Sequence, residues 1–255
     1  MRVWDVHPGY LNRQSLLGEH REVHALLVVI GERRAGYARH PETLRWKGHL
    51  GALRRRHAVL VAEMTLRGYR HRSPAPHRGP WGRWPSGFLD APGGQFVLLA
   101  EKYRDREPGR IPLPKSLPQL WAQHKYSVMA RDPARYRAIG RRVATSRRRS
   151  DLGPLALELV ELLREPTTKG RLVNAVAHLW GYVSADAERA PELDDPAEAL
   201  TEIARLAAER DVQYLLHSTA LSDLRCVVLR SSSALPGLPA GSRTPAGGRR
   251  RGEAR

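Results

Sequence analysis

The sequence predicts an all-α protein, with two helical domains joined by a proline-rich connector and followed by a disordered basic tail. One reason is that apolar residues recur at steps of three, four and seven, the spacing that buries one stripe of an α-helix. A second is the N-cap residue and proline at Asp132-Pro133 and Asp195-Pro196, a pair typical of helix starts. We expect domains at residues 1–72 and 117–229, the connector at 73–116 and the tail at 230–255.

The first domain is expected to contain two long helices separated by a short one. The first long helix lies between Tyr10 and Arg33, where four apolar residues share one face: Leu16, Val23, Leu27 and Ile30. Pro41 suits the first turn of a short helix at 41–46. The second long helix is expected at 50–67, with Gly68 as its C-cap and Arg54-Arg55-Arg56 on its exposed side.

The connector and the second domain differ in composition. Residues 73–118 hold nine of the 19 prolines, so one helix is expected there, at 95–104. Trp81 and Trp84 are expected to pin the connector onto a domain, with stacking on unpaired bases as the alternative. The second domain should be helical at 118–130, 133–148, 154–165, 168–184, 196–210 and 212–226, and the tail from Ser231 lacks apolar periodicity.

The formal net charge of +17 suggests a polyanionic partner, although arginine-rich composition alone is the competing explanation. The distribution of the charge favours the first interpretation. Residues 1–72 contain 14 basic and 6 acidic residues, whereas residues 117–229 contain 16 and 15. We therefore expect a nucleic-acid surface on the first domain, with Arg147-Arg148-Arg149 as a second phosphate contact.

The cysteine content and the first residues of the chain indicate the cellular compartment. The single cysteine, Cys226, excludes an intramolecular disulfide, and no long apolar run begins the chain. We expect a cytoplasmic, nucleoid-associated protein with neither a secretory signal nor a membrane span. Protein partners and oligomeric state are not indicated.

A metal site is not expected, although His20 and His24 have the one-turn spacing of two metal ligands. Their string, His-Arg-Glu-Val-His, differs from the His-Glu-x-x-His order of zinc hydrolases, and the sequence indicates no third ligand. The chain also lacks a glycine-rich phosphate loop, a nucleophile elbow and a cofactor fingerprint. We therefore predict no metal and no organic cofactor.

The first long helix carries the candidate functional face. The helical repeat places Gln14, Gly18, Arg21 and Ala25 on one face of this helix, with Glu22 beside them. Gly18 and Ala25 are small, so they leave a shallow strip between the longer polar side chains. Such a strip suits the close approach of a phosphate backbone. The preceding Pro8-Gly9 turn should reverse the chain and bring Met1 and Arg2 back beside this helix.

An amine and a carboxylate are the chemically active groups of this face. The ordinary pKa of an α-amino group is about 7.7–8.0, so the Met1 amine is partly neutral and nucleophilic at physiological pH. Such an amine can attack a sugar C1′, expel the base and form a Schiff base, after which β-elimination cleaves the strand. Glu22 could move the protons, and its alternative role is a surface carboxylate paired with Arg21 or His24.

Residues 1–71 resemble the pyrimidine-dimer DNA glycosylases, the family of phage endonuclease V. The likeness rests on Arg2, Gln14 and Arg21-Glu22, on the string HPETLRWKGHL, and on a helix ending at Arg67-Gly68-Tyr69. The resemblance implies an amine nucleophile at Met1, acid or base catalysis by Glu22, and DNA contacts from Arg2, Gln14 and Arg21 around a flipped base. It also implies damaged double-stranded DNA as the partner.

The chain departs from that family at several positions. The phage-type enzyme exposes a threonine after methionine removal, whereas Met1 occupies that register here. The large Arg2 should block methionine removal and so retain the amine in place. Ser15 and Ala25 stand where the phage type has histidine and arginine, and the aromatic, lysine-containing segment that helps recognise the dimer has no clear counterpart.

Residues 117–229 resemble a second group, the uncharacterised YbgA-like helical domains. The likeness rests on HKYSVMARDPARYRAIGRRVA and LLREPTTKGRLVNAVAHLWGYV, whose motif residues include His124, Lys125, Asn174 and His178. Asn174 and His178 are one turn apart, so they form either a polar site or a buried pair between helices.

The sequence therefore predicts a DNA-repair glycosylase with abasic-site lyase activity. The alternatives are a noncatalytic nucleic-acid-binding adaptor and an RNA-modification accessory protein centred on the second domain.

Overall fold

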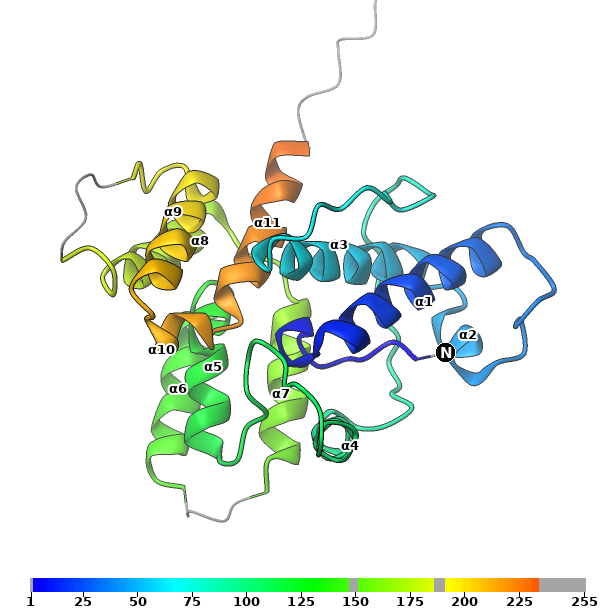
Figure 1. Cartoon of the computed structure of the whole chain (residues 1–255), viewed down its shortest axis with the longest axis horizontal. Helices are drawn as coiled ribbons and strands as arrows, with labels where there is room; N and C mark the ends of the chain where they lie inside the picture. The colour runs from blue at the N-terminus through cyan, green and yellow to red at the C-terminus, as the bar shows by residue number, and fades with distance from the viewer. Residues whose placement is uncertain (1, 147–150, 186–190, 234–255) are drawn as a thin grey trace, which may run out of the picture.

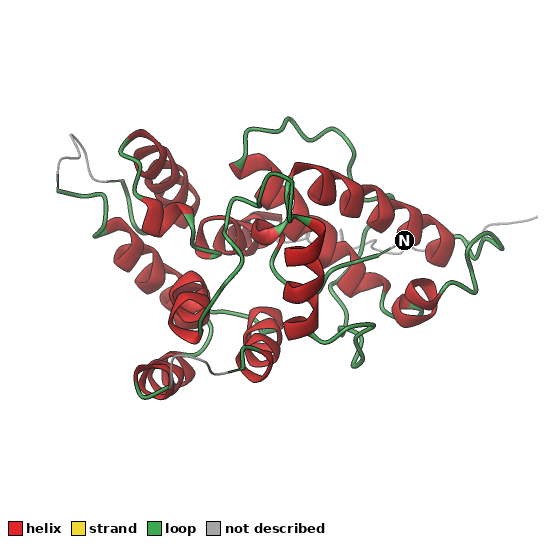
Figure 2. Ribbon diagram, turned by 60° about the horizontal axis from the view of Figure 1, so that its bottom comes forward, coloured by secondary structure: helices red, strands yellow, loops and turns green. Residues whose placement is uncertain are grey.

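The computed structural model describes residues 2–146, 151–185 and 191–233, and every regular element in these ranges is a helix (Figures 1 and 2). The first part contains the 3-10 turn η1 and the helices α1 (Arg13–Gly31), α2 (Pro41–Trp46) and α3 (Leu50–Leu66), with η1 at Pro8–Tyr10. The connector supplies α4 (Pro92–Lys102). The second part contains α5 (Leu117–Met129), α6 (Pro133–Ala144), α7 (Gly153–Arg164), α8 (Lys169–Trp180), α9 (Pro196–Glu209), α10 (Gln213–Leu216) and α11 (Ala220–Ser233).

The all-α prediction is confirmed, and the local capping rules explain most helix starts. Asn12 caps α1 by accepting from the Ser15 amide, while Asp132 and Asp195 cap α6 and α9, each followed by proline. Of the residues named in the sequence analysis, Met1, Arg147-Arg148-Arg149 and the tail beyond Ser233 lie outside the described residues.

One predicted helix is wrong, because 212–226 is divided into α10 and α11. At the break, the Thr219 amide and hydroxyl both donate to the Gln123 carbonyl of α5, at 2.8 and 3.0 Å. The Ser218 hydroxyl accepts from the Ala220 amide at 3.2 Å and so opens α11. Tertiary hydrogen bonds to α5 therefore replace the helical bonds that the apolar pattern predicted.

Buried apolar side chains form two clusters. The first runs from Val3 to Leu162 and combines α1 and α3 with α4, α5, α6 and α7; the second combines α5 with α8, α9 and α11. Helix α11 also packs directly against α3. The first cluster crosses residue 117, whereas the buried residues of the second all lie between Tyr126 and Val228; the domain division at residue 117 stays a prediction.

A buried polar network crosses between the two parts of the chain. Glu63 of α3 accepts hydrogen bonds from Arg67, from Arg110 and from the Ser222 hydroxyl of α11, at 2.7, 2.8 and 2.7 Å. The two arginines hold the pKa of this fully buried carboxyl well below its usual range, against the opposing effect of burial. Nearby, burial lowers the pKa of His7 to about 3.

Residues 69–84, here called the return segment, run back along α3 from its carboxyl end to its amino end (Figure 1). The fit is close: a Cβ added at Gly51 would lie 2.2 Å from the Gly82 amide nitrogen. Trp84 ends the segment against Trp46 and beneath Arg164, with centroid distances of 5.8 and 4.7 Å. Trp84 thus pins the connector onto the core, as the sequence indicated. None of the described helices combines the length and apolar character needed to cross a membrane.

Candidate active site at the amino terminus

The amino-terminal segment lies extended alongside α1, as the Pro8-Gly9 turn predicted (Figure 1). The Trp4 amide donates to Glu19 Oε1 at 3.2 Å, and the Val3 amide donates to Glu42 Oε1 at 3.1 Å. An extended residue advances about 3.3 Å and a helical residue about 1.5 Å, so two residues of strand span about four of helix. The segment runs antiparallel to α1 (Figure 1), so the residues before Trp4 lie toward the carboxyl end of α1, the direction in which Glu22 follows Glu19.

The predicted functional face of α1 points to solvent. Gln14 and Arg21 are exposed, and Glu22 is half-buried beside them. The opposite face is buried by Leu16, Val23 and Leu27. The three polar side chains therefore share a surface that a large ligand can reach, next to the returning amino-terminal strand.

A buried ion pair holds the strand in place. Arg56 of α3 donates to both carboxylate oxygens of Glu19, at 2.6 and 2.8 Å, and also to the Val6 carbonyl at 3.1 Å. The expectation that Arg54-Arg55-Arg56 lies on the exposed side of its helix is therefore wrong at Arg56, which is 3% exposed. Arg55 is half-buried and donates to the Leu163 carbonyl at 3.0 Å.

Arg2 contacts the connector. Its guanidinium pairs with Asp90, just before α4, and lies over the Trp4 ring at 4.7 Å. Gln95 of α4 accepts from the Asp5 and Val6 amides at 2.8 and 3.2 Å and donates to Asp5 at 3.0 Å. The connector thus forms part of the candidate site, a contribution that the sequence did not indicate.

The carboxyl end of α4 adds positive charge to this face. Arg106 donates to Gln14 at 3.4 Å. Burial, with Arg106 and Arg2 nearby, lowers the pKa of Lys102. Lys102 and Arg106 thereby extend the basic surface from Arg2 to the start of α1.

Four histidines meet on the buried side of the same helix. His20 and His24 of α1, His57 of α3 and His71 of the return segment place their ligand atoms within 4.8 Å of one another. Burial and the neighbouring histidines lower the pKa of His20 to about 4 and that of His57 to about 3, so both rings are neutral at physiological pH. His57 and His71 come from distant segments, so the spacing of His20 and His24 on α1 did not indicate them.

Of the second-domain candidates, His124 lies apart from Lys125 and His178, which contact one common ring. His124 is 4% exposed and its Nδ1 lies 3.3 Å from the Tyr10 hydroxyl, so it belongs to the contact with the first part. Lys125 lies over the Tyr126 ring at 4.9 Å, and His178 stacks on the same ring at 6.4 Å. Asn174 and His178 are both exposed, which contradicts a buried pair between helices.

Of the site residues that the sequence did not predict, Glu19 had a recognisable signal. Glu19 interrupts the apolar stripe of α1 between Leu16 and Val23, and a charged residue in such a stripe requires a buried partner. The identity of that partner, Arg56, depends on helix packing and was not predictable. Asp90, Gln95, His57 and His71 likewise reach the site through tertiary contacts.

Comparisons with known proteins match two separate segments of the chain to two different families. No curated protein and no solved structure shows significant similarity to the chain. Two family models match: residues 125–194 match a family described as a protein of unknown function, DUF1722. Residues 1–76, which contain the amino-terminal strand and helices α1, α2 and α3, match the pyrimidine dimer DNA glycosylase family.

Proposed function

We propose that this protein is a DNA-repair glycosylase with abasic-site lyase activity on pyrimidine-dimer or related lesions in double-stranded DNA. The observation that carries the proposal is the match of residues 1–76 to the pyrimidine dimer DNA glycosylase family. Support comes from the amino-terminal strand that lies along α1, where the Trp4 amide donates to Glu19, three residues before Glu22. A cytoplasmic, nucleoid-associated location is part of the proposal.

The proposed reaction begins with the neutral Met1 amine. Its lone pair attacks C1′ of the damaged nucleotide, the C1′–N bond breaks, and the base leaves with the bonding electrons and a proton. Opening of the sugar ring and loss of an amine proton give a protonated Schiff base. A base then removes the C2′ proton, the electrons expel the 3′ phosphate, and water hydrolyses the Schiff base to release the amine.

Glu22 is proposed to move the protons in this sequence. Its side chain is half-buried and lies on α1 between the exposed Arg21 and the buried stripe that contains Val23. A carboxylate there can take the amine proton and then the C2′ proton, returning protons to the leaving groups. The buried Glu19 is unsuited to this task because both of its oxygens are bound by Arg56.

The exposed basic and amide side chains around Glu22 are proposed to hold the DNA. Arg21, Gln14, Arg106 and Lys102 can contact phosphates, while Arg2, held by Asp90, positions the strand that carries the amine. The damaged nucleotide would be extruded from the duplex to reach C1′.

The test separates chemistry from binding. Glu22→Gln should lose strand cleavage on ultraviolet-damaged and abasic duplexes by about 10²-fold or more while retaining DNA affinity. Glu32→Gln is the matched control, since it makes the same change at an exposed position just after α1. Wild-type protein that binds damaged DNA but cleaves neither substrate would favour the noncatalytic adaptor. Preference for RNA at matched salt would favour the RNA-modification accessory.

A further inference from the structure

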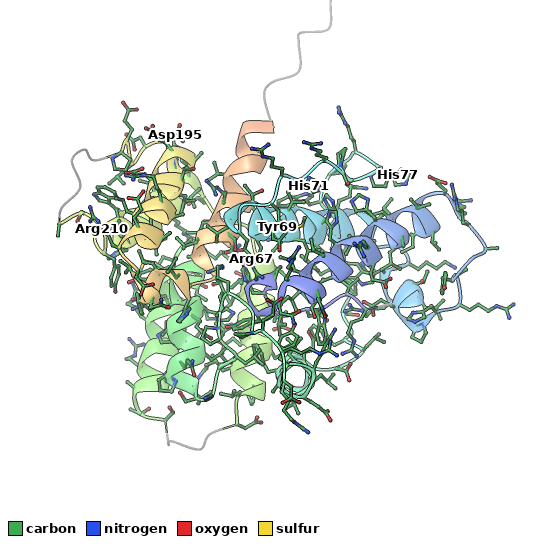
Figure 3. The ribbon with its side chains drawn as sticks, viewed as in Figure 1. Arg67, Tyr69, His71, His77, Asp195 and Arg210 are labelled. Atoms are coloured by element: carbon green, nitrogen blue, oxygen red, sulfur yellow. The ribbon has the colours of Figure 1, made fainter. Side chains whose placement is uncertain are left out.

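The four-histidine cluster joins three segments that are distant in the sequence. His20 and His24 lie one turn apart on α1, and His57 lies on α3. His71, which is labelled in Figure 3, lies on the return segment. His20 and His57 are buried, and the other two are half-buried. Nothing in the amino-terminal chemistry proposed above uses this cluster.

The Nε2 atoms converge. The Nε2 of His20 lies 3.2 Å from that of His57 and 3.1 Å from that of His71, and the Nε2 of His24 lies 3.0 Å from that of His57. A tetrahedral ion with metal–nitrogen bonds of about 2.0–2.1 Å has ligand separations of about 3.3–3.4 Å. Three of the separations are thus slightly shorter than those of a tetrahedral site.

Hydrogen bonding among the rings does not account for these contacts. A neutral imidazole nitrogen carries either one proton or one lone pair, directed in the ring plane. The Nε2 atoms of His20 and His57 each face two other Nε2 atoms, so a single donor or acceptor cannot serve both with good geometry. One cation at the centre would accept all four lone pairs at once.

We propose that His20, His24, His57 and His71 bind one divalent transition-metal ion, with zinc as the ion that fits best. Imidazole is a favourable ligand for zinc, which prefers four ligands in tetrahedral geometry. The return segment brings the main chain of Ser73 beside both His24 and His57.

The site is structural. Four histidines complete a tetrahedral shell and leave no position for water or substrate. The ion ties the return segment to α1 and α3, where Gly31 and Gly51 already allow the segment to approach closely. Because Glu22 lies between His20 and His24, the ion also fixes the helical turn that presents the candidate functional face.

The first experiment measures metal on the full chain. Protein purified under reducing conditions should contain about one equivalent of zinc by elemental analysis. After chelation, Co²⁺ should restore one equivalent with the intense visible absorption of four-coordinate cobalt and should raise the thermal unfolding midpoint. Only weak six-coordinate absorption, or no bound ion, would overturn the proposal.

Variants then assign the ligands. His71→Gln should lose the stoichiometric ion, and His71→Cys should keep it while adding a thiolate-to-cobalt charge-transfer band. His178→Gln is the matched control, because it removes an exposed histidine outside the cluster and should bind like the wild type. The cysteine variant keeps the proposal testable if the glutamine variant fails to fold. Equal metal content in His71→Gln and the wild type would exclude His71 and the four-histidine site.

Discussion

Glu19 and Arg56 illustrate how single residues determine the position of the catalytic candidates. Their ion pair is fully buried, and Glu19 also accepts from the Trp4 amide. Burial raises the pKa of Glu19 in spite of the two hydrogen bonds from Arg56. The pair therefore positions the strand through contacts to both the Trp4 amide and the Val6 carbonyl.

Glu19→Gln should destabilise the fold by about 3–5 kcal/mol, because it leaves the Arg56 guanidinium buried without a countercharge. Urea unfolding measures this change. Glu22→Gln, which makes the same substitution one turn away on the solvent-facing side, should change the free energy of unfolding by less than about 0.5 kcal/mol. Equal stability of the two variants would show that the buried pair does not anchor the strand.

His7 is a second residue whose burial has a measurable consequence. Its pKa falls to about 3 in the folded state, mainly through burial, from an ordinary value of 6.5. The unfolded chain therefore binds the proton first, and folding stability decreases as pH falls from about 6.5 toward 3. Glu63 and Asp223, whose pKa values are lowered, add to acid sensitivity only below about pH 4.5.

His7→Asn keeps a side chain that can cap η1 and removes this titration. Between pH 7 and pH 5 the variant should lose about 2 kcal/mol less stability than the wild type. Denaturant titrations at the two pH values provide the measurement, with the exposed His178→Asn as control. An unchanged pH dependence in His7→Asn would contradict the assignment.

At the scale of the elements, α4 and the residue Asp90 before it hold the amino-terminal strand through hydrogen bonds and an ion pair. Gln95 accepts from two strand amides, and Asp90 pairs with Arg2. A segment that composition predicted to be a linker thus supports the candidate site. Four residues beyond α4, Arg106 donates to Gln14, which brings this part of the connector near the start of α1.

Gln95→Ala should free the strand without unfolding the helices. It leaves two strand amides without partners, at a cost of about 1–3 kcal/mol. Hydrogen exchange at Asp5 and Val6 should accelerate, and cleavage of abasic DNA should slow. Val97→Ala changes an exposed residue of the same helix and should have neither effect. Unchanged exchange in Gln95→Ala would show that other contacts hold the strand.

The helices themselves were largely predictable from the sequence, because periodicity, N-caps and proline act within a few residues. The face of α1 with Gln14, Arg21 and Glu22 followed from the same local rules. The break at Ser218 and Thr219, the burial of Arg56, and the meeting of His57 and His71 with α1 all depend on contacts between distant segments. The spacing of residues along the sequence does not indicate which distant segments come into contact.

At the scale of the whole molecule, the helices of the first part of the chain pack against those of the second part. The apolar cluster that begins at Val3 extends to Leu162, and α11 packs on α3. The Glu63 network adds polar contacts between α3 and α11 through Ser222.

Residues 1–116 expressed alone should therefore fail to unfold cooperatively, because they expose the face that α5, α7 and α11 bury. Thermal unfolding followed by near-ultraviolet circular dichroism, with the full chain as control, tests this expectation. A sharp transition in the isolated segment would show that it folds independently.

The central claim is that the Met1 amine forms a Schiff base with damaged DNA. The most direct measurement is borohydride trapping on abasic and ultraviolet-damaged duplexes, followed by peptide mapping of the adduct. We predict one covalent adduct at the Met1 amine, absent when that amine is acetylated. Failure to trap an adduct despite intact DNA binding, or an adduct that maps to Lys102 with Met1 unmodified, would contradict the claim.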